Sequence, residues 1–322
     1  MKKFILIAAV LFASVTFTYA QLQFTSIDYP GGFATRTRGI NNHGQIVGSY
    51  ADQDGNLHAL LSQKGKFIPL APETILGTTY SDAFKINDRG DVVGWVCPYF
   101  CHGFLFRKGV VTTLDFPGAT ATYAWDINES GTVAGVWDLF DSQENFLYEG
   151  GFIWKDGNFT EVTFPGAGDT GVTAINARGD FVGAWDRGPN TTTSGFFSSK
   201  GKFASFDAPF PDVTLTQPQG MNERGHIVGA GYVNGIPHGF LKIGTYFMEI
   251  AYPGAAYTSA WGIDSAGQMV GNWLDSAGTV HGWLAQLGHK CKQPYAPGSA
   301  KRSVPSPLNN PVHGKRVSST ID

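Results

Sequence analysis

Short runs of apolar and aromatic residues alternate along the chain with glycine, proline and polar turn residues. The segments 91–95 and 123–127 are typical, because β-branched and aromatic residues fill them and turn residues bound them. Such runs predict strands rather than helices. Between two of them, Lys155-Asp156-Gly157-Asn158 has the composition of a tight hairpin turn. The pattern therefore indicates many short antiparallel strands.

One arrangement of these runs occurs six times. In each copy an apolar residue precedes Asn or Asp, and glycines follow three and seven positions after that anchor. An aromatic residue lies within three positions of the second glycine, and the copies recur about every 45 residues. The anchors are Asn41, Asn87, Asn128, Asn176, Asn222 and Asp264.

Each copy contains four predicted strands, which is the content of one β-propeller blade. The sequence therefore predicts an all-β, six-bladed β-propeller with four short antiparallel strands per blade. The first ordered segment, 24–30, has the pattern of a fourth strand, and the last, 281–284, has that of a third. We expect the N-terminal strand to close the last blade and cover its free edge. A β-solenoid is the rival architecture, but its rungs are shorter and it needs capping ends.

Histidine motifs in these units resemble a known repeat. His58-Ala59-Leu60 and the His-Gly-Phe sequences at 102–104 and 238–240, with the recurrent Ile-Asn-x-x-Gly, are similar to the extracellular HAF repeat of exported bacterial proteins. The resemblance covers about residues 24–287 and implies a propeller-like repeat protein without implying an activity. Two units depart from it, with Gly150 and Ser194 at the histidine position, and the first unit lacks Gly-Phe.

The two ends of the chain differ from the repeats. Residues 1–20 have a basic start, a short apolar run and a small residue at the end, which predicts a secretory signal cleaved near Ala20. Residues 290–322 are basic and rich in Pro and Ser, which predicts a disordered tail. Residues 21–289 then form a single domain. No other run approaches the roughly 18 apolar residues of a membrane span, so we expect a secreted or periplasmic protein.

Composition sharpens this prediction. Of 322 residues 42 are Gly, 15% are charged and 14% are aromatic, which excludes a disordered chain and disfavours a helical one. Without its basic ends the body is acidic, which argues against nucleic acid as a partner. In an oxidising compartment Cys97 and Cys101 are expected to form a disulfide, because their spacing does not match a Cys-x-x-Cys redox or metal pair. Cys291 is then left unpaired.

Several recurrent polar residues have structural explanations. Asn at the first and Gly at the fourth position of a turn favour the type I conformation, so the anchors are interpreted as hairpin corners rather than metal ligands. The four histidines are expected to have a structural role, such as a hydrogen bond between blades, rather than to share a metal ion. The acidic turn 52–56 does not match an EF-hand, and calcium binding there stays an open alternative. No other metal or cofactor is predicted. These histidines are His58, His102, His238 and His281.

One position differs among the copies and is the best candidate for a ligand surface. A Thr or Ser stands six residues before every anchor, and the next residue varies among charged, aromatic and small types. Loops at this position would surround the mouth of the central channel, where variable residues on a constant scaffold favour binding. With two nearby tyrosines, the candidates are Arg36, Tyr80, Asp82, Tyr123, Gln217 and Tyr257.

No nucleophile elbow, zinc-protease motif or phosphate loop occurs in the sequence. We therefore predict an exported, monomeric binding or scaffold propeller whose ligand is a glycan or a cell-surface protein. The alternative is an extracellular polysaccharide hydrolase or lyase with a carboxylate such as Asp82 in the funnel. Carboxylates of shifted pKa that converge at the channel mouth would favour that enzyme. A structural envelope component without a ligand is a third possibility.

Overall fold

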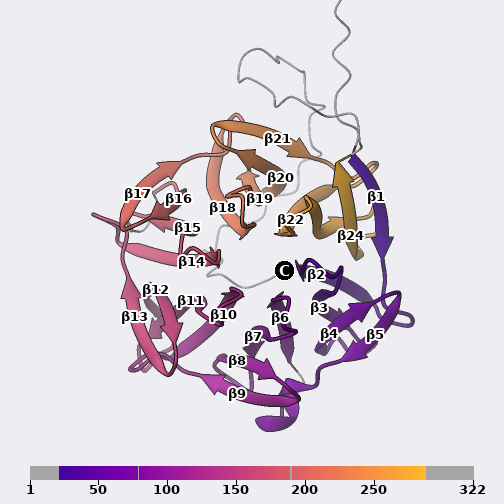
Figure 1. Cartoon of the computed structure of the whole chain (residues 1–322), viewed down its shortest axis with the longest axis horizontal. Coiled ribbons are helices and arrows are strands. Elements are labelled where there is room, and N and C mark those ends of the chain that lie inside the picture. Colours follow the sequence, from indigo (N-terminus) through magenta and orange to yellow (C-terminus); the bar gives the residue numbers. More distant parts are fainter. Residues whose placement is uncertain (1–21, 79, 189–190, 288–322) are drawn as a thin grey trace, which may run out of the picture.

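The computed structural model describes residues 22–78, 80–188 and 191–287. The predicted signal 1–20, the predicted tail 290–322 and Cys291 lie outside the described residues. The described chain is all-β apart from the short 3-10 helix η1 (Pro72–Ile75). Its strands form antiparallel sheets placed around one axis (Figure 1).

Each group of four strands contributes one inner strand that lies next to the axis in Figure 1. The inner strands are β2 (Ala34–Ile40), β6 (Ser81–Ile86), β10 (Ala121–Ile127), β14 (Asp169–Ile175), β18 (Val213–Met221) and β22 (Tyr257–Ile263). The second strands are β3 (Ile46–Ala51), β7 (Val92–Val96), β11 (Val133–Phe140), β15 (Phe181–Asp186), β19 (Ile227–Val233) and β23 (Gln268–Leu274).

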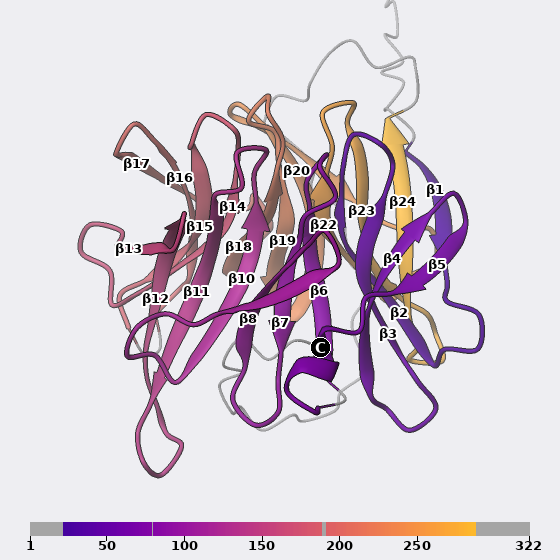
Figure 2. The same ribbon diagram turned by 60° about the horizontal axis from the view of Figure 1, so that its bottom comes forward.

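The third and fourth strands follow outward from the axis. The third strands are β4 (Leu57–Gln63), β8 (His102–Arg107), β12 (Phe146–Lys155), β16 (Ser194–Ser199), β20 (Ile236–Ile243) and β24 (Val280–Leu287). The outer strands are β5 (Lys66–Pro69), β9 (Val110–Leu114), β13 (Asn158–Val162), β17 (Lys202–Phe206), β21 (Tyr246–Ile250) and β1 (Leu22–Ile27). Figure 2 shows the inner strands running along the axis from one end of the molecule to the other.

Strand pairing confirms the prediction of four-stranded antiparallel units. Four separate sheets are β2–β5, β6–β9, β10–β13 and β14–β17. The other eight strands form two groups of four, β18–β21 and β22–β24 with β1, joined by a single parallel bridge between His238 and Thr258. The N-terminal strand β1 pairs with the last strand β24 over its whole length, as the sequence predicts. Strand β2 in turn contacts β22, β23 and β24.

The second recurrent glycine of each unit is required because a backbone carbonyl of the inner strand lies too close to it for a side chain to fit. A Cβ added at Gly94 would lie 2.0 Å from the carbonyl oxygen of Asp82, and one at Gly48 would lie 1.9 Å from that of Arg36. No side chain fits at such distances. The contact accompanies a register shift in every inner strand, where one residue bulges out of the pairing.

Buried third-strand side chains fill the space between neighbouring sheets. Phe104 of the second sheet packs with Val47 and Ala59 of the first and with Val92 of its own. Burial of one such side chain contributes about 1.5–3 kcal/mol. The fully buried residues at this position are Leu60, Phe104, Phe152, Phe196, Phe240 and Trp283.

The histidines of the third strands lie beside carboxylates of their own units. His58 Nε2 lies 3.0 Å from Asp52 Oδ2, and His102 Nδ1 lies 2.7 Å from Asp115 Oδ1. His281 Nδ1 lies 2.7 Å from Oδ1 of Asp28, which directly follows β1. His238 Nδ1 lies 3.7 Å from Glu249 Oε1. Each partner belongs to the histidine's own sheet, because the strand ends place a carboxylate directly beside the third strand.

Candidate functional site

The axis has two ends that differ in chemistry. We call the end where the inner strands begin the entry end, and the end where they meet the Asn/Asp turns the turn end. Between them, the residue that bulges from each inner strand takes a different side chain in most units. These bulged residues are Arg38, Phe84, Trp125, Thr173, Gln219 and Trp261.

Aromatic bulged residues from three sheets meet across the axis. The Phe84 and Trp125 rings stack with centroids 4.3 Å apart, and Trp125 and Trp261 are parallel at 6.0 Å. The Arg38 guanidinium lies 3.7 Å from the centroid of the Trp261 ring. Such a cation–π contact is strongest when it is shielded from water, as Arg38 is.

Arg38 and Asp82 form a fully buried ion pair. Arg38 Nε donates to Asp82 Oδ2 at 2.9 Å, and neither side chain is exposed. The two terminal nitrogens of Arg38 and Oδ1 of Asp82 have no hydrogen-bond partner in the described protein. Burial lowers the pKa of Arg38, and the Asp82 carboxylate opposes that shift. Charges buried in this way are stable only when they are paired.

Further buried polar atoms of the inner strands also lack a protein partner. They are Nε of Arg36, Oε1 of Gln219 and Nε1 of Trp125. An unsatisfied buried group costs about 1–3 kcal/mol, so native proteins rarely accumulate them without a functional reason.

The structure places the predicted ligand residues unequally. Tyr80 is exposed, and Arg36, Tyr123, Gln217 and Tyr257 are part-buried at the entry end. The prediction that Asp82 lies at the channel mouth is wrong, because this residue is fully buried and does not reach the solvent there. Pairing with Arg38 of the neighbouring sheet holds it inside.

The ring of bulged residues, two positions further along each inner strand, was not predicted. The sequence does contain a signal for these residues, because the position three before each anchor varies among Arg, Phe, Trp, Thr and Gln. The bulge that turns this residue out of the ladder does not show in the hydrophobic pattern. Arg38, Gln219 and Trp261 are therefore the additional candidates.

Four carboxylates lie between the third sheet (β10–β13) and the fourth (β14–β17). Asp138 is directly opposite Glu149 in the β11–β12 ladder, and Asp169 is opposite Asp186 in β14–β15. The Glu149 backbone N–H donates to Asp169 Oδ1 at 3.0 Å. Burial and the neighbouring carboxylates raise the pKa of Asp138 to about 7 and that of Glu149 to about 8.

This cluster reaches the variable position of the fourth sheet, where glycine stands. A Cβ at Gly171 would lie 3.0 Å from Glu149 Oε1, so the glutamate occupies the space that a side chain takes in other units. Tyr123 lies at the same position of the third sheet, and burial with Asp138 and Glu149 raises its pKa. We call Asp138, Glu149, Asp169 and Asp186 the acidic quartet.

The disulfide between Cys97 and Cys101 is present and borders the entry end. The Cys101 carbonyl accepts the backbone N–H of Thr122 at 2.9 Å, which ties this loop to the start of β10. Both cysteines pack on the cluster that contains Phe84 and Trp125.

The turn end is regular, and the anchors have the predicted turn role. Asn128 Oδ1 accepts the backbone N–H groups of Ser130 and Thr132, both at 3.0 Å. Its Nδ2 also donates to the Asn176 carbonyl of the next unit at 3.0 Å. Equivalent amide bonds between units join Asn41 to Asn87, Asn87 to Asn128 and Asn222 to Asp264.

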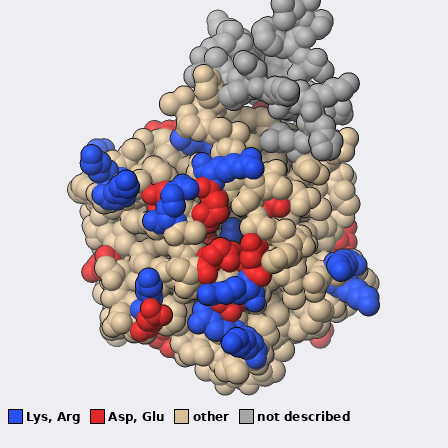
Figure 3. All heavy atoms as spheres, viewed as in Figure 1, with Lys and Arg blue, Asp and Glu red and all other residues tan. Residues whose placement is uncertain are grey.

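Acidic residues that follow the anchors add a second set of bonds between units. Asp88 accepts the Asn42 N–H at 2.8 Å, Glu129 accepts the Asp88 N–H at 3.0 Å, and Glu223 accepts the Ala177 N–H at 2.9 Å. Figure 3 shows acidic side chains gathered around the centre of this face.

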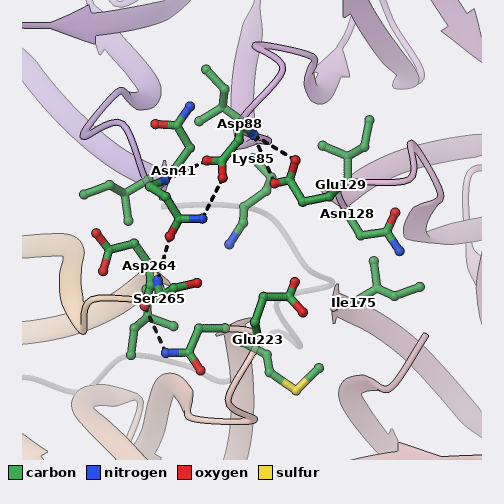
Figure 4. A pocket seen from close by; sticks show the side chains of 16 residues that line it. Asn41, Lys85, Asp88, Asn128, Glu129, Ile175, Glu223, Asp264 and Ser265 are labelled. Carbon is green, nitrogen blue, oxygen red and sulfur yellow. Dashed lines mark hydrogen bonds between the residues drawn. The ribbon is translucent and has the colours of Figure 1, made fainter. Parts of the chain in front are cut away.

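These acids and Lys85 line a small cavity at the turn end. Lys85 points into its centre in Figure 4, and the cavity measures about 40 Å³. This volume holds a few water molecules, since one needs about 10–15 Å³. It is too small for a sugar ring.

Two features are absent from the part of the chain that is described. No group of three or more His, Cys, Asp or Glu side chains there is arranged to hold a metal ion. No helix among those residues is long and apolar enough to cross a membrane.

Comparison with known proteins gives structural similarity alone. No family model and no curated protein matches the chain. The β-propeller domain of the Trilobed protease from Pyrococcus furiosus is 10% identical over 78% of this chain and 95% of that chain, with a TM-score of 0.46. A fucose-specific lectin from Aleuria aurantia is 10% identical over 82% and 91%, with a TM-score of 0.48. At these values neither similarity assigns an activity to this chain.

Proposed function

We propose that the chain is an exported, closed six-bladed β-propeller that binds a glycan at the entry end of its axis. The closed ring is supported by the pairing of β1 with β24 and by the contacts of β2 with β22, β23 and β24. Export rests on the signal pattern of residues 1–20, and the propeller repeat on the resemblance to HAF repeats.

A set of unpaired polar atoms beside aromatic rings is the main support for a glycan as the ligand. Arg38 offers two donor groups, and Asp82 and Gln219 each offer an acceptor oxygen. Sugar hydroxyls both donate and accept, and the apolar face of a sugar packs against rings such as Trp261. A few converging polar groups among aromatic side chains are typical of small-ligand sites.

A glycan fits this site better than a protein surface does. The unpaired atoms lie inside the ring of inner strands, where the surface of a folded domain cannot contact them. The hydrolase or lyase alternative placed its carboxylate at Asp82. The ion pair with Arg38 gives that residue a binding role instead, because its free oxygen is an acceptor held in place.

A glycan array probed with the purified protein tests the proposal. We expect binding to at least one glycan class, and a loss of about tenfold or more in affinity for Trp261→Leu, which removes a stacking ring. The matched control is Trp185→Leu, since Trp185 stacks on Phe164 away from the axis. Absence of binding to any glycan by the folded protein would contradict the proposal. An equal loss in both variants would contradict the location of the site.

A further inference from the structure

A second cavity lies between the third sheet (β10–β13) and the fourth (β14–β17), outward from the axis. It measures about 270 Å³, against about 40 Å³ for the cavity on the axis. Small-ligand sites begin at about 300 Å³, so this space is close to the size that one sugar ring needs. Lys155, Ala177, Arg178 and Gly179 line it and are themselves exposed, so the cavity is open to solvent.

The preceding gap, between the second sheet (β6–β9) and the third, is filled by an ion cluster. One terminal nitrogen of Arg89 and one of Arg107 lie 2.9 and 3.1 Å from Asp91 Oδ2. A Cβ added at Gly131, the anchor glycine of the third unit, would lie 2.8 Å from Arg89 and 2.9 Å from Arg107. The two guanidinium groups therefore cover the turn of the next unit.

Short side chains in the third unit leave the next gap open. At the positions of the two arginines and the aspartate, this unit has Ser130, Lys155 and Thr132. Gly179 is the counterpart of Gly131 in the fourth unit, and nothing lies within 4 Å of a Cβ added there. The same backbone that holds an ion cluster in one gap thus forms a cavity in the next.

The cavity is electropositive although the body of the protein is acidic. Lys155 and Arg178 line it, and none of the described residues in its wall is acidic. Asp180, which lies 2.9 Å from Arg178 Nε, balances the charge of that arginine. Lys155 forms no ion pair with another described side chain. One positive charge is thus available to a ligand, which matches a carboxylate.

The rest of the wall suits a hydroxylated ring. Ser130 Oγ donates to Asn128 Oδ1 at 2.8 Å and lies 3.0 Å from Thr132 Oγ1. Because the one proton of Ser130 is used in this way, the Thr132 hydroxyl donates to Ser130, and both oxygens can still accept a hydrogen bond. Ile153 and the Phe181 ring give the wall an apolar part. Sugar hydroxyls can donate to such oxygens, and the apolar face of a sugar packs on such side chains.

We propose that this cavity binds a sugar acid, with its carboxylate at Lys155 and Arg178 and its ring against Phe181. The site is separate from the entry end of the axis, so the inference does not rest on the proposed glycan site. A neutral sugar of the same size lacks the charge. An aromatic acid has the charge but lacks the hydroxyl donors.

An NMR titration of the purified protein with three probes tests the inference. The probes are D-glucuronate, D-glucose and benzoate, all at pH 7. We expect glucuronate to bind about fivefold or more tightly than either of the others, since about 1 kcal/mol is the upper range for an ion pair open to water. The backbone N–H signals of Ser130 and Gly179 should shift during the titration.

Two variants locate the site. Lys155→Gln should weaken glucuronate binding about fivefold, while Lys202→Gln, the same change on an exposed lysine of the fourth sheet, should leave it unchanged. Ser130→Arg/Thr132→Asp installs two residues of the ion cluster that fills the preceding gap, and it should abolish binding. Thermal melts check that all three variants are folded.

The outcomes separate this inference from the proposed function. Equal affinity for glucuronate and glucose, or unchanged affinity in Lys155→Gln, overturns the anion site. Benzoate binding as tightly as glucuronate overturns the sugar acid as the ligand class. Shifts confined to the indole signals of Trp125 and Trp261 would place glucuronate on the axis and overturn this site. None of these results removes glycan binding at the entry end, which the array and Trp261→Leu test.

Discussion

The two ends of the axis are built from the same inner strands but use them in opposite ways. At the turn end Asn recurs in five of the six units, and the side chains of Asn41, Asn87, Asn128 and Asn222 bond both their own turn and the next unit. At the entry end the residue type changes from unit to unit, and several buried polar atoms lack a protein partner. Repetition therefore marks the residues that hold neighbouring units together. Variation marks the residues that are available for a ligand.

The largest effect should come from breaking the buried pair of the entry end. Arg38→Met leaves the Asp82 carboxylate buried without a partner, so we expect about 3–5 kcal/mol loss of stability in urea denaturation. The double variant Arg38→Met/Asp82→Leu should recover most of that loss. If the single variant changes stability by less than about 1 kcal/mol, Asp82 finds another partner and our account of the pair is wrong.

The acidic quartet predicts a pH dependence of stability. The folded pKa values of Asp138 and Glu149, about 7 and about 8, lie above the ordinary values of 3.8 and 4.5. The folded state therefore holds more protons than the unfolded one between about pH 4 and pH 8, so stability falls as pH rises through this window. Asp138→Asn removes one such carboxyl.

The Asp138→Asn variant should gain about 2 kcal/mol of stability at pH 8 and nearly nothing at pH 4, where the wild-type carboxyl is neutral. Urea denaturation at the two pH values measures the gain. Glu161→Asn, an exposed change on β13, is the control and should show no such difference. A gain of the same size at both pH values would show that packing, not charge, explains the effect.

At the turn end, Asn128→Ala removes three accepted hydrogen bonds and one donated hydrogen bond. We expect a loss of about 1–3 kcal/mol in urea denaturation, because the freed backbone groups of Thr132 and Asn176 belong to buried residues. Asn158→Ala, in an exposed hairpin turn, should cost less. Equal losses for the two variants would contradict the role of the amide bond between units.

The smallest effect should come from restoring the repeat in the sixth unit, where the anchor is Asp. Burial raises the pKa of Asp264, so its ionised form is disfavoured in the folded state at pH 7. Asp264→Asn should therefore stabilise the protein by about 1 kcal/mol at pH 7 and by less at pH 4. Thermal melts at both values check this. Destabilisation at pH 7 would show that the carboxylate has a specific partner there, with Lys85 the first to examine.

The sequence predicted the fold well because a repeated unit makes its own regularity visible. Six copies of the anchor and glycine pattern located the turns, and the strand content of each unit followed from them. The pairing of β1 with β24 was predictable for the same reason, since the first segment has a fourth-strand pattern and the last a third-strand pattern.

The site was predicted only in part, because it depends on contacts between different units. Burial of Asp82 is set by Arg38, which is 44 residues away in sequence and belongs to another sheet. The acidic quartet has members in two sheets, and Glu149 fits against the neighbouring sheet because Gly171 there has no side chain. No residue spacing within one unit predicts this contact. The partners of the histidines were not predicted for a similar reason, because these acids lie near strand ends whose positions only the folded sheet defines.

The central claim is that the ligand binds at the entry end and not at the turn end. One nitrogen-15 correlation spectrum, recorded during titration with the glycan that the array selects, reports on both ends. We expect the indole N–H signals of Trp125 and Trp261 to shift while the side-chain amides of Asn87 and Asn128 stay unchanged. Shifts confined to the asparagine amides, or no shift at saturating glycan, would contradict the account.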